Sequence, residues 1–264
     1  MEVRDPALHL VTGSQKKLRK DILLMQVINI YSILCGSLKG FDSTILDNTI
    51  ERILGHFSEL KDVRSLLYFN HSISLGNIVA TMYPLEYPNS GLPVDHPELE
   101  LIYQQYINLD FFFYFTRIVT KGDLMARVIN ISHEFQHASQ YTVDKKIYMY
   151  GCIIRHMLED LISEVRSPIE YDAERKSKII AYDLCGDRAV NELIESMLSN
   201  PDVPREFWEV LKSINIQEEF DLKNKILELW EDHKIEEKIQ QLKKSRIKNY
   251  DQKKVIEMYN FANT

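Results

Sequence analysis

Cysteine is scarce in this sequence. Only three cysteines occur among 264 residues, at Cys35, Cys152 and Cys185, and no two of them form a C-x-x-C pair. A disulfide framework or a cysteine zinc site requires cysteines at closer, paired spacings, so neither is indicated. We expect free thiols, as in proteins of a reducing compartment.

An excess of positive charge is also lacking. The 39 acidic residues outnumber the 32 basic ones, and the net charge is −7. Nucleic-acid-binding proteins generally carry a one-sided basic field, so we expect no nucleic-acid partner. Two short basic runs, Lys16–Lys20 and Lys243–Lys254, match no nucleic-acid-binding motif, and we interpret them as solvated helix faces.

Long hydrophobic runs are missing as well. The most apolar stretch, Leu109–Phe115, is interrupted by Asp110 and is far shorter than the roughly 20 residues that span a bilayer. Met1–Gln15 lacks the order of basic, apolar and small residues that marks a secretory signal. We therefore expect no membrane segment and synthesis in the cytoplasm. Export by a signal-less route, as toxins or effectors use, stays open.

The residues that are present predict a folded, mostly helical α+β protein. Apolar residues make up 45% of the chain and charged residues 27%, the balance of a globular protein. Apolar spacing divides it into an N-terminal helical region (1–62), a core with a small sheet (63–215) and a charged C-terminal helical extension (216–264). Helices are predicted at Lys16–Leu38, Ser43–Leu60, from Asp123 through the metal motif described below, Lys146–Glu164, Pro168–Leu184, Arg188–Leu198 and Arg205–Ile214. Strands are predicted at Leu66–Phe69, Asn77–Tyr83 and Tyr106–Phe115.

The C-terminal extension has two interpretations. Its segment Gln217–Asn249 places regularly spaced apolar residues among many charges, which is typical of a short coiled coil or of a helix that faces a partner or a second copy. The alternative is a solvated helix packed on its own domain. We favour the second interpretation.

The run His133-Glu134-Phe135-Gln136-His137 has the H-E-x-x-H pattern in the middle of a predicted helix. Residues four apart project from one helix face, so His133 and His137 can bind one zinc ion through their imidazoles. Glu134 lies one step round the helix, where it can take a proton from a zinc-bound water. The pattern therefore predicts a zinc-dependent hydrolase.

A third ligand is expected from the segment that begins at Ser167-Pro168. Glu170 is our choice, and Glu174, four residues later on the same face, can hydrogen-bond the far ring nitrogen of a ligand histidine. Ser167-x-x-Glu170 also has the spacing of a capping box, which is the competing interpretation of Glu170. Asp172 points to another face and is the weaker rival for the ligand position.

These two stretches together resemble the gluzincin branch of the zincin metallopeptidases, in which H-E-x-x-H is followed by a glutamate on a downstream helix. The resemblance covers motifs within Asp123–Leu184 and implies zinc ligands at His133, His137 and Glu170, with Glu134 as the general base. It also implies an acidic residue supporting a ligand, here Glu174. The longer metzincin pattern is not matched, because position 140 is glutamine and position 143 is valine.

The resemblance implies a zinc-dependent metallopeptidase, an endopeptidase acting on a protein or peptide substrate. The strand near Asn77–Tyr83 is a candidate sheet edge for an extended peptide, and an ordinary buried strand is the alternative. His156, Tyr171 and Tyr150 are candidate oxyanion donors, although packed or surface roles are commoner for such residues. A catalytically silent zincin-like interaction module, or a helical structural protein with an accidental motif, are the other hypotheses.

Overall fold

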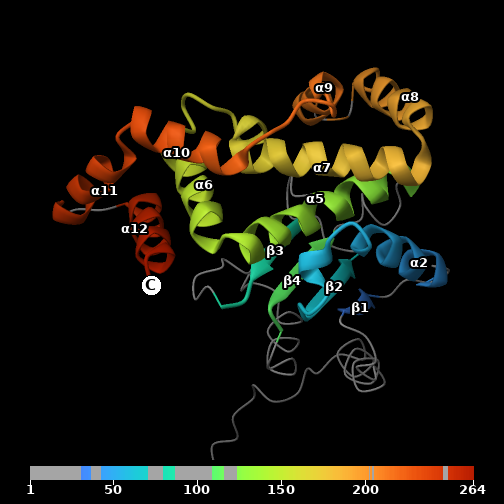
Figure 1. Ribbon diagram of the computed structural model, residues 1–264, viewed down its shortest axis with the longest axis horizontal. Coiled ribbons are helices and arrows are strands. Elements are labelled where there is room, and N and C mark those ends of the chain that lie inside the picture. Colours follow the sequence, from blue (N-terminus) through green and yellow to red (C-terminus); the bar gives the residue numbers. More distant parts are fainter. Residues whose placement is uncertain are drawn as a thin grey trace, which may run out of the picture.

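The computed structural model describes residues 31–36, 43–70, 80–86, 109–115, 124–201, 203, 205–245 and 249–264. It is mostly helical with a small sheet, which confirms the predicted α+β class at that level (Figure 1). The predictions for residues 16–30, 77–79, 106–108 and 123 lie outside the described residues. No helix in the described ranges has both the length and the apolar character needed to cross a membrane.

Among the described residues the sheet has four strands, β1 (Tyr31–Gly36), β2 (Ser65–Asn70), β3 (Ala80–Pro84) and β4 (Phe111–Phe115). Their order in the sheet is β1-β2-β4-β3. Strands β1, β2 and β4 are parallel, and β3 runs antiparallel to β4 at the edge. Every side chain of β4 is buried, and all five are aromatic, so this strand forms the centre of the core below the helices. Strands β2, β3 and β4 confirm the strand predictions where residues are described. Strand β1 was not predicted.

The helix predicted over Lys16–Leu38 is wrong at its C-terminal end, because Tyr31–Gly36 forms strand β1. This segment is a short apolar run, and such a run fits a buried parallel strand as well as a buried helix. Its register beside β2, from Tyr31 opposite Ser65 to Gly36 opposite Asn70, makes it part of the core sheet. The sheet therefore includes a strand from the region that we assigned to the N-terminal helices.

Helix α5 (Leu124–Val143) lies between the sheet and helix α7 (Pro168–Cys185) (Figure 1). On the sheet side, Phe135 packs edge-on against Phe113 of β4, with ring centroids 5.0 Å apart, and against Phe57 at 6.0 Å. Phe57 lies between α2 (Ser43–Leu54) and the short 3-10 helix η2 (Ser58–Leu60). This aromatic packing fixes the rotation of α5 about its own axis.

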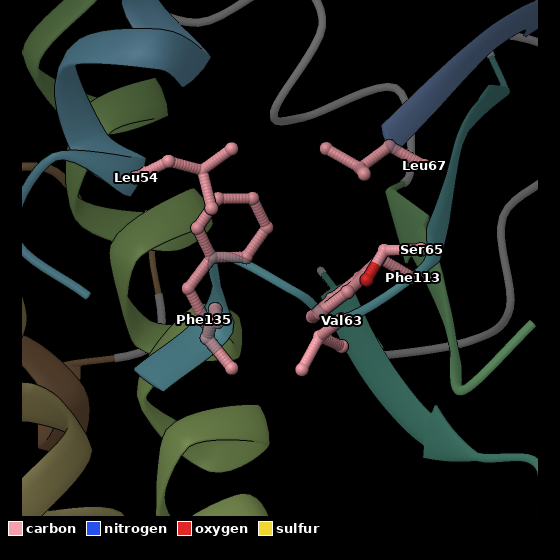
Figure 2. Close-up of a pocket in the computed structure, with 7 residues that line it drawn as sticks. Leu54, Val63, Ser65, Leu67, Phe113 and Phe135 are labelled. Carbon is pink, nitrogen blue, oxygen red and sulfur yellow. The ribbon is translucent and has the colours of Figure 1, made fainter. Parts of the chain in front are cut away.

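A small, mainly apolar pocket lies on the same side of α5. Figure 2 shows Phe135 facing Phe113 and Leu67 across it, with Leu54 and Val63 at its sides. Leu60 and Ser65 complete the lining. Because Phe135 points to the sheet, its neighbours Glu134 and Gln136 are turned toward other faces of the helix.

Helix α6 (Lys145–Met157) follows α5 after a single residue, Asp144, whose side chain accepts a 3.1 Å hydrogen bond from the Ile147 amide and caps the new helix. The predicted helix Lys146–Glu164 is too long, because α6 ends at Met157 and a turn leads to the 3-10 helix η3 (Glu164–Arg166). Pro168 then starts α7, as predicted for a proline at the first helical position.

Glycine at position 151 lets α6 approach the start of α7 closely. A Cβ atom at Gly151 would lie well inside van der Waals contact with the Cγ2 atom of Ile169 and 3.1 Å from the Cδ1 atom of Ile226. Ile169 directly precedes Glu170, so this contact sets the position of the predicted third ligand.

We expect Gly151→Ala to lower the free energy of unfolding by about 1–3 kcal/mol, because overpacking of a fixed contact outweighs the helix propensity that alanine adds. Urea denaturation measures the change. The loss should shrink in an Ile169→Ala background, where the opposing methyl group is gone. An equal loss in both backgrounds would contradict this account of the close approach.

The remaining chain is helical and packs on the core. Helices α8 (Asp187–Leu198) and α9 (Arg205–Ser213) lie beside α7, and α10 (Leu222–Asp232), α11 (Ile235–Lys244) and α12 (Tyr250–Ala262) form the tail (Figure 1). A left-handed residue, Lys234 at φ 50°, separates α10 from α11. The apolar residues Ile226, Trp230, Ile235 and Ile239 are buried within the chain, which supports packing on the domain over a partner-facing helix.

Candidate metal centre

The three predicted ligands converge. His133 and His137 project from one face of α5, and Glu170 reaches them from the first turn of α7. The Nε2 atoms of the two histidines are 3.1 Å apart, and the Oε2 atom of Glu170 is 3.1 Å from His133 Nε2 and 3.2 Å from His137 Nε2. Among the described residues this is the group that could hold a metal ion.

The triangle of donor atoms fits a cation better than a set of hydrogen bonds. A single proton can lie along only one edge of such a triangle, whereas one cation contacts all three atoms. Two ligands of a tetrahedral zinc ion at 2.0–2.1 Å are about 3.3 Å apart, close to the separations observed here. Two imidazoles and a carboxylate are also a ligand set that zinc accepts.

Gln140 orients the ring of His137. The Nδ1 atom of His137 lies 3.0 Å from Oε1 of Gln140, and the amide nitrogen of Gln140 donates to the Ile169 carbonyl at 2.9 Å and to Asp172 Oδ2 at 2.8 Å. Both of these partners are acceptors, so the amide oxygen must face the histidine. The Nε2 atom of His137 lies on the other side of the ring, toward His133 and Glu170.

Glu170 is held from both of its oxygens. Oε1 accepts a 2.6 Å hydrogen bond from Arg155 of α6, while Oε2 faces the histidines. Burial by itself raises the pKa of Glu170, but the two histidines and Arg155 outweigh burial and hold the pKa well below its ordinary value. Glu170 is therefore an ionised carboxylate with one oxygen directed at the histidine pair.

The charge of Glu170 also acts on His137. Burial lowers the pKa of His137, yet the neighbouring Glu170 carboxylate raises it to about 9. A positive charge is thus favoured where the three donor atoms meet. A bound cation would supply the same charge.

Glu134 is buried, with 6% of its surface exposed, and lies next to the ligands. Burial raises the pKa of Glu134, and the histidines and Arg155 offset only part of this rise. A carboxylate with a raised pKa beside a cationic centre has the property expected of a general base.

Glu174 is placed in the site region but forms no hydrogen bond with a ligand histidine in the structure. Its side chain is 1% exposed, and burial together with the charge of Glu170 raises its pKa to about 10. Its Oε2 atom and the Nδ1 atom of His133 are both buried and have no hydrogen-bond partner. The supporting role of Glu174 toward a ligand histidine stays a prediction, with His133 Nδ1 as the unsatisfied candidate.

The two competing interpretations of this segment are resolved. Ser167 makes no side-chain cap hydrogen bond, so the proposed capping box with Glu170 does not form. Asp172 is not in the ligand triangle; its Oδ2 atom accepts hydrogen bonds from Gln136 and Gln140 of α5. Asp172 therefore supports the histidine helix from outside the triangle.

The three candidate oxyanion donors have partners in the tail. Tyr150 stacks on Trp230 with ring centroids 3.9 Å apart, and Tyr171 packs on Phe220 at 4.9 Å. Burial and the neighbouring Lys254 lower the pKa of His156 to about 4. None of the three belongs to the ligand triangle.

Two tyrosines that were not among the predicted donors lie on elements that contact α5. The ring of Tyr148 on α6 packs edge-on against His137, with centroids 6.2 Å apart. Burial raises the pKa of Tyr83 on β3, and the charge of Glu134 raises it further. These phenols are further candidates for hydrogen-bond donors near the site.

Comparison with known proteins assigns no family. No family model matches the chain, and no solved structure matches it. Over 80 residues the chain is 30% identical to the protein translocase subunit SecA of Synechococcus sp. (strain WH7803), a match that covers 30% of this chain and 8% of SecA. The matched segment is thus a minor part of both proteins, and the chain covers far less than two thirds of the length of SecA.

Proposed function

We propose that this chain is a zinc-dependent peptidase with a zincin-like core. The observation that carries the proposal is the convergence of His133, His137 and Glu170 from two helices, with the buried carboxyl of Glu134 beside them. A structural ion-pair network would not require two imidazoles and a carboxylate to aim one donor atom each at a common point.

His133, His137 and Glu170 would hold the zinc ion. Zinc in such a site supplies Lewis acidity, which polarises a carbonyl and makes a water molecule easier to deprotonate. Glu134 accepts the proton of the attacking water and afterwards delivers it to the leaving amine. Arg155 keeps Glu170 ionised and in place.

An extended peptide is the substrate that the surrounding fold suits. Strand β3 lies at the sheet edge next to α5 and pairs on one side, with β4, among the described residues. A peptide can add to such an edge as a further strand through main-chain hydrogen bonds, which orients its backbone along the sheet. Strand β3 contacts α5, the helix that carries both histidines, so a peptide added at that edge would run beside this helix.

The test is cleavage of a peptide library by the purified chain. We expect cleavage that a zinc chelator abolishes and that added zinc restores, with mass spectrometry identifying the new termini. Bound zinc at one ion per chain without any cleavage would favour the alternative of a silent zincin-like module. Absence of zinc binding would overturn the metal site itself.

A further inference from the structure

The proposed reaction gives no role to Gln140, although its side chain contacts the predicted ligand His137. Its side chain is buried, with 6% exposed, and every polar atom of its amide has a partner: His137 Nδ1, the Ile169 carbonyl and Asp172 Oδ2. A buried glutamine with all its hydrogen bonds made is fixed in one orientation, since a flipped amide would set its oxygen against two acceptors.

Asp172 is itself fixed by a second amide. Its Oδ2 atom accepts a 2.6 Å hydrogen bond from Gln136, which lies one turn before Gln140 on α5. The two glutamines therefore clamp one carboxylate of α7 from the same side of α5. This clamp joins the helix that carries both histidines to the helix that carries Glu170.

We propose that Asp172, Gln140 and the Ile169 carbonyl form a positioning relay that keeps the proton of His137 on Nδ1 and so reserves Nε2 for the metal ion. The inference deepens the proposed function and rests on it for the identity of the cation. Gln140 and Asp172 act through His137 and touch neither substrate nor metal.

The relay explains why position 140 suits glutamine and not glutamate. A glutamate there would present oxygens both to the Ile169 carbonyl and to Asp172, which are already acceptors. Glutamine offers an oxygen to the histidine and two N–H groups to the acceptors. The amide is thus the side chain that satisfies all three neighbours at once.

The first test measures zinc affinity of the full chain by competition with a chromophoric chelator. Removing a hydrogen-bond partner of a ligand histidine typically costs about 10–100-fold in metal affinity, and we expect a loss in this range for Gln140→Leu. The double variant Gln140→Glu with Asp172→Asn keeps an acceptor for His137 and gives it a donor at position 172. It still sets an oxygen against the Ile169 carbonyl and a donor against Gln136, so we expect it to regain only part of the affinity.

The second test observes the imidazole proton directly. In the wild-type chain, long-range ¹H–¹⁵N NMR should show a slowly exchanging proton on His137 Nδ1, with and without zinc, and Gln140→Leu should lose that slow exchange. Zinc affinity within threefold of wild type in Gln140→Leu, or a wild-type Nδ1 without a proton, would overturn the relay.

The two readouts separate this proposal from the enzymatic one. If the wild-type chain shows the protected Nδ1 proton but cleaves no peptide, the relay stands and the proposed function fails. If Gln140→Leu does not fold, the wild-type NMR signal still decides the matter.

Discussion

Hydrolysis by Glu134→Gln is expected to fall by about 10²–10⁴-fold, the usual contribution of a general base. The amide is nearly the same size as the carboxyl, but it cannot take a proton from the attacking water. Glu134 is not one of the three residues that would hold the metal ion, so the zinc content should stay at the wild-type level. Steady-state cleavage of a peptide substrate, together with metal analysis of the same sample, measures both quantities.

The matched control is Glu159→Gln, the same chemical change at an exposed glutamate in the turn after α6. This variant should cleave as the wild type does. Full activity in Glu134→Gln would refute the mechanism, because Glu134 is the group that takes the proton of the attacking water in it.

Glu170→Ala should lose zinc binding and hydrolysis together. Loss of a direct ligand costs more than the roughly 10–100-fold that follows from loss of an outer hydrogen bond, so we expect zinc affinity to fall by more than 100-fold. The Arg155 side chain would also lose its 2.6 Å partner close to the two histidines, which disfavours a cation there. Chelator competition gives the affinity, and elemental analysis gives the zinc content.

Glu164 offers a control for the loss of an Arg155 partner. It forms a 3.1 Å ion pair with Arg155 but is largely exposed and lies outside the ligand triangle. Glu164→Gln should therefore retain its zinc. A normal zinc content in Glu170→Ala would instead move the third ligand to Asp172 or Glu174 and would remove the central premise of the proposed function.

The local part of the site could be predicted because it depends on helix geometry alone. His133 and His137 are four residues apart on α5, and that spacing brings their rings to one face wherever the helix lies. Glu170 could be selected because Ser167-Pro168 marks the start of a helix, which placed the carboxylate in its first turn. The contact between these two helices depends on the tertiary fold, so it could be established only from the structure.

The missed residues show two different limits. Gln140 is three residues after His137 on the same helix face, and this spacing is a signal that could have identified it. Arg155 carried no comparable signal, since it contacts Glu170 only because α6 ends beside the start of α7. Tyr83 likewise depends on where β3 lies at the edge of the sheet.

The fold was harder to predict where apolar residues are consecutive. Tyr31–Gly36 contains too few polar residues to distinguish a period of two from a period of 3.6, and its pairing with β2 decides the outcome. The prediction for α7, Pro168–Leu184, agrees with the observed Pro168–Cys185 to within one residue. For α5 the sequence predicted a helix through the metal motif without a C-terminal bound, and the helix continues to Val143. A strand that is covered on both faces of its sheet lacks the alternation of apolar and polar residues that identifies a strand in the sequence.

Helix α6 faces two parts of the molecule at once. One side is covered by α10 and α12, with Tyr150 stacked on Trp230, and Arg155 near its end bonds Glu170. The tail and the Glu170 carboxylate therefore contact one structural element. If docking of the tail raises the affinity for a cation, binding of the cation stabilises the docked tail by the same factor. In that case, variants that loosen the packing of α10 and α12 on α6 would lower the affinity for a cation that these helices do not contact.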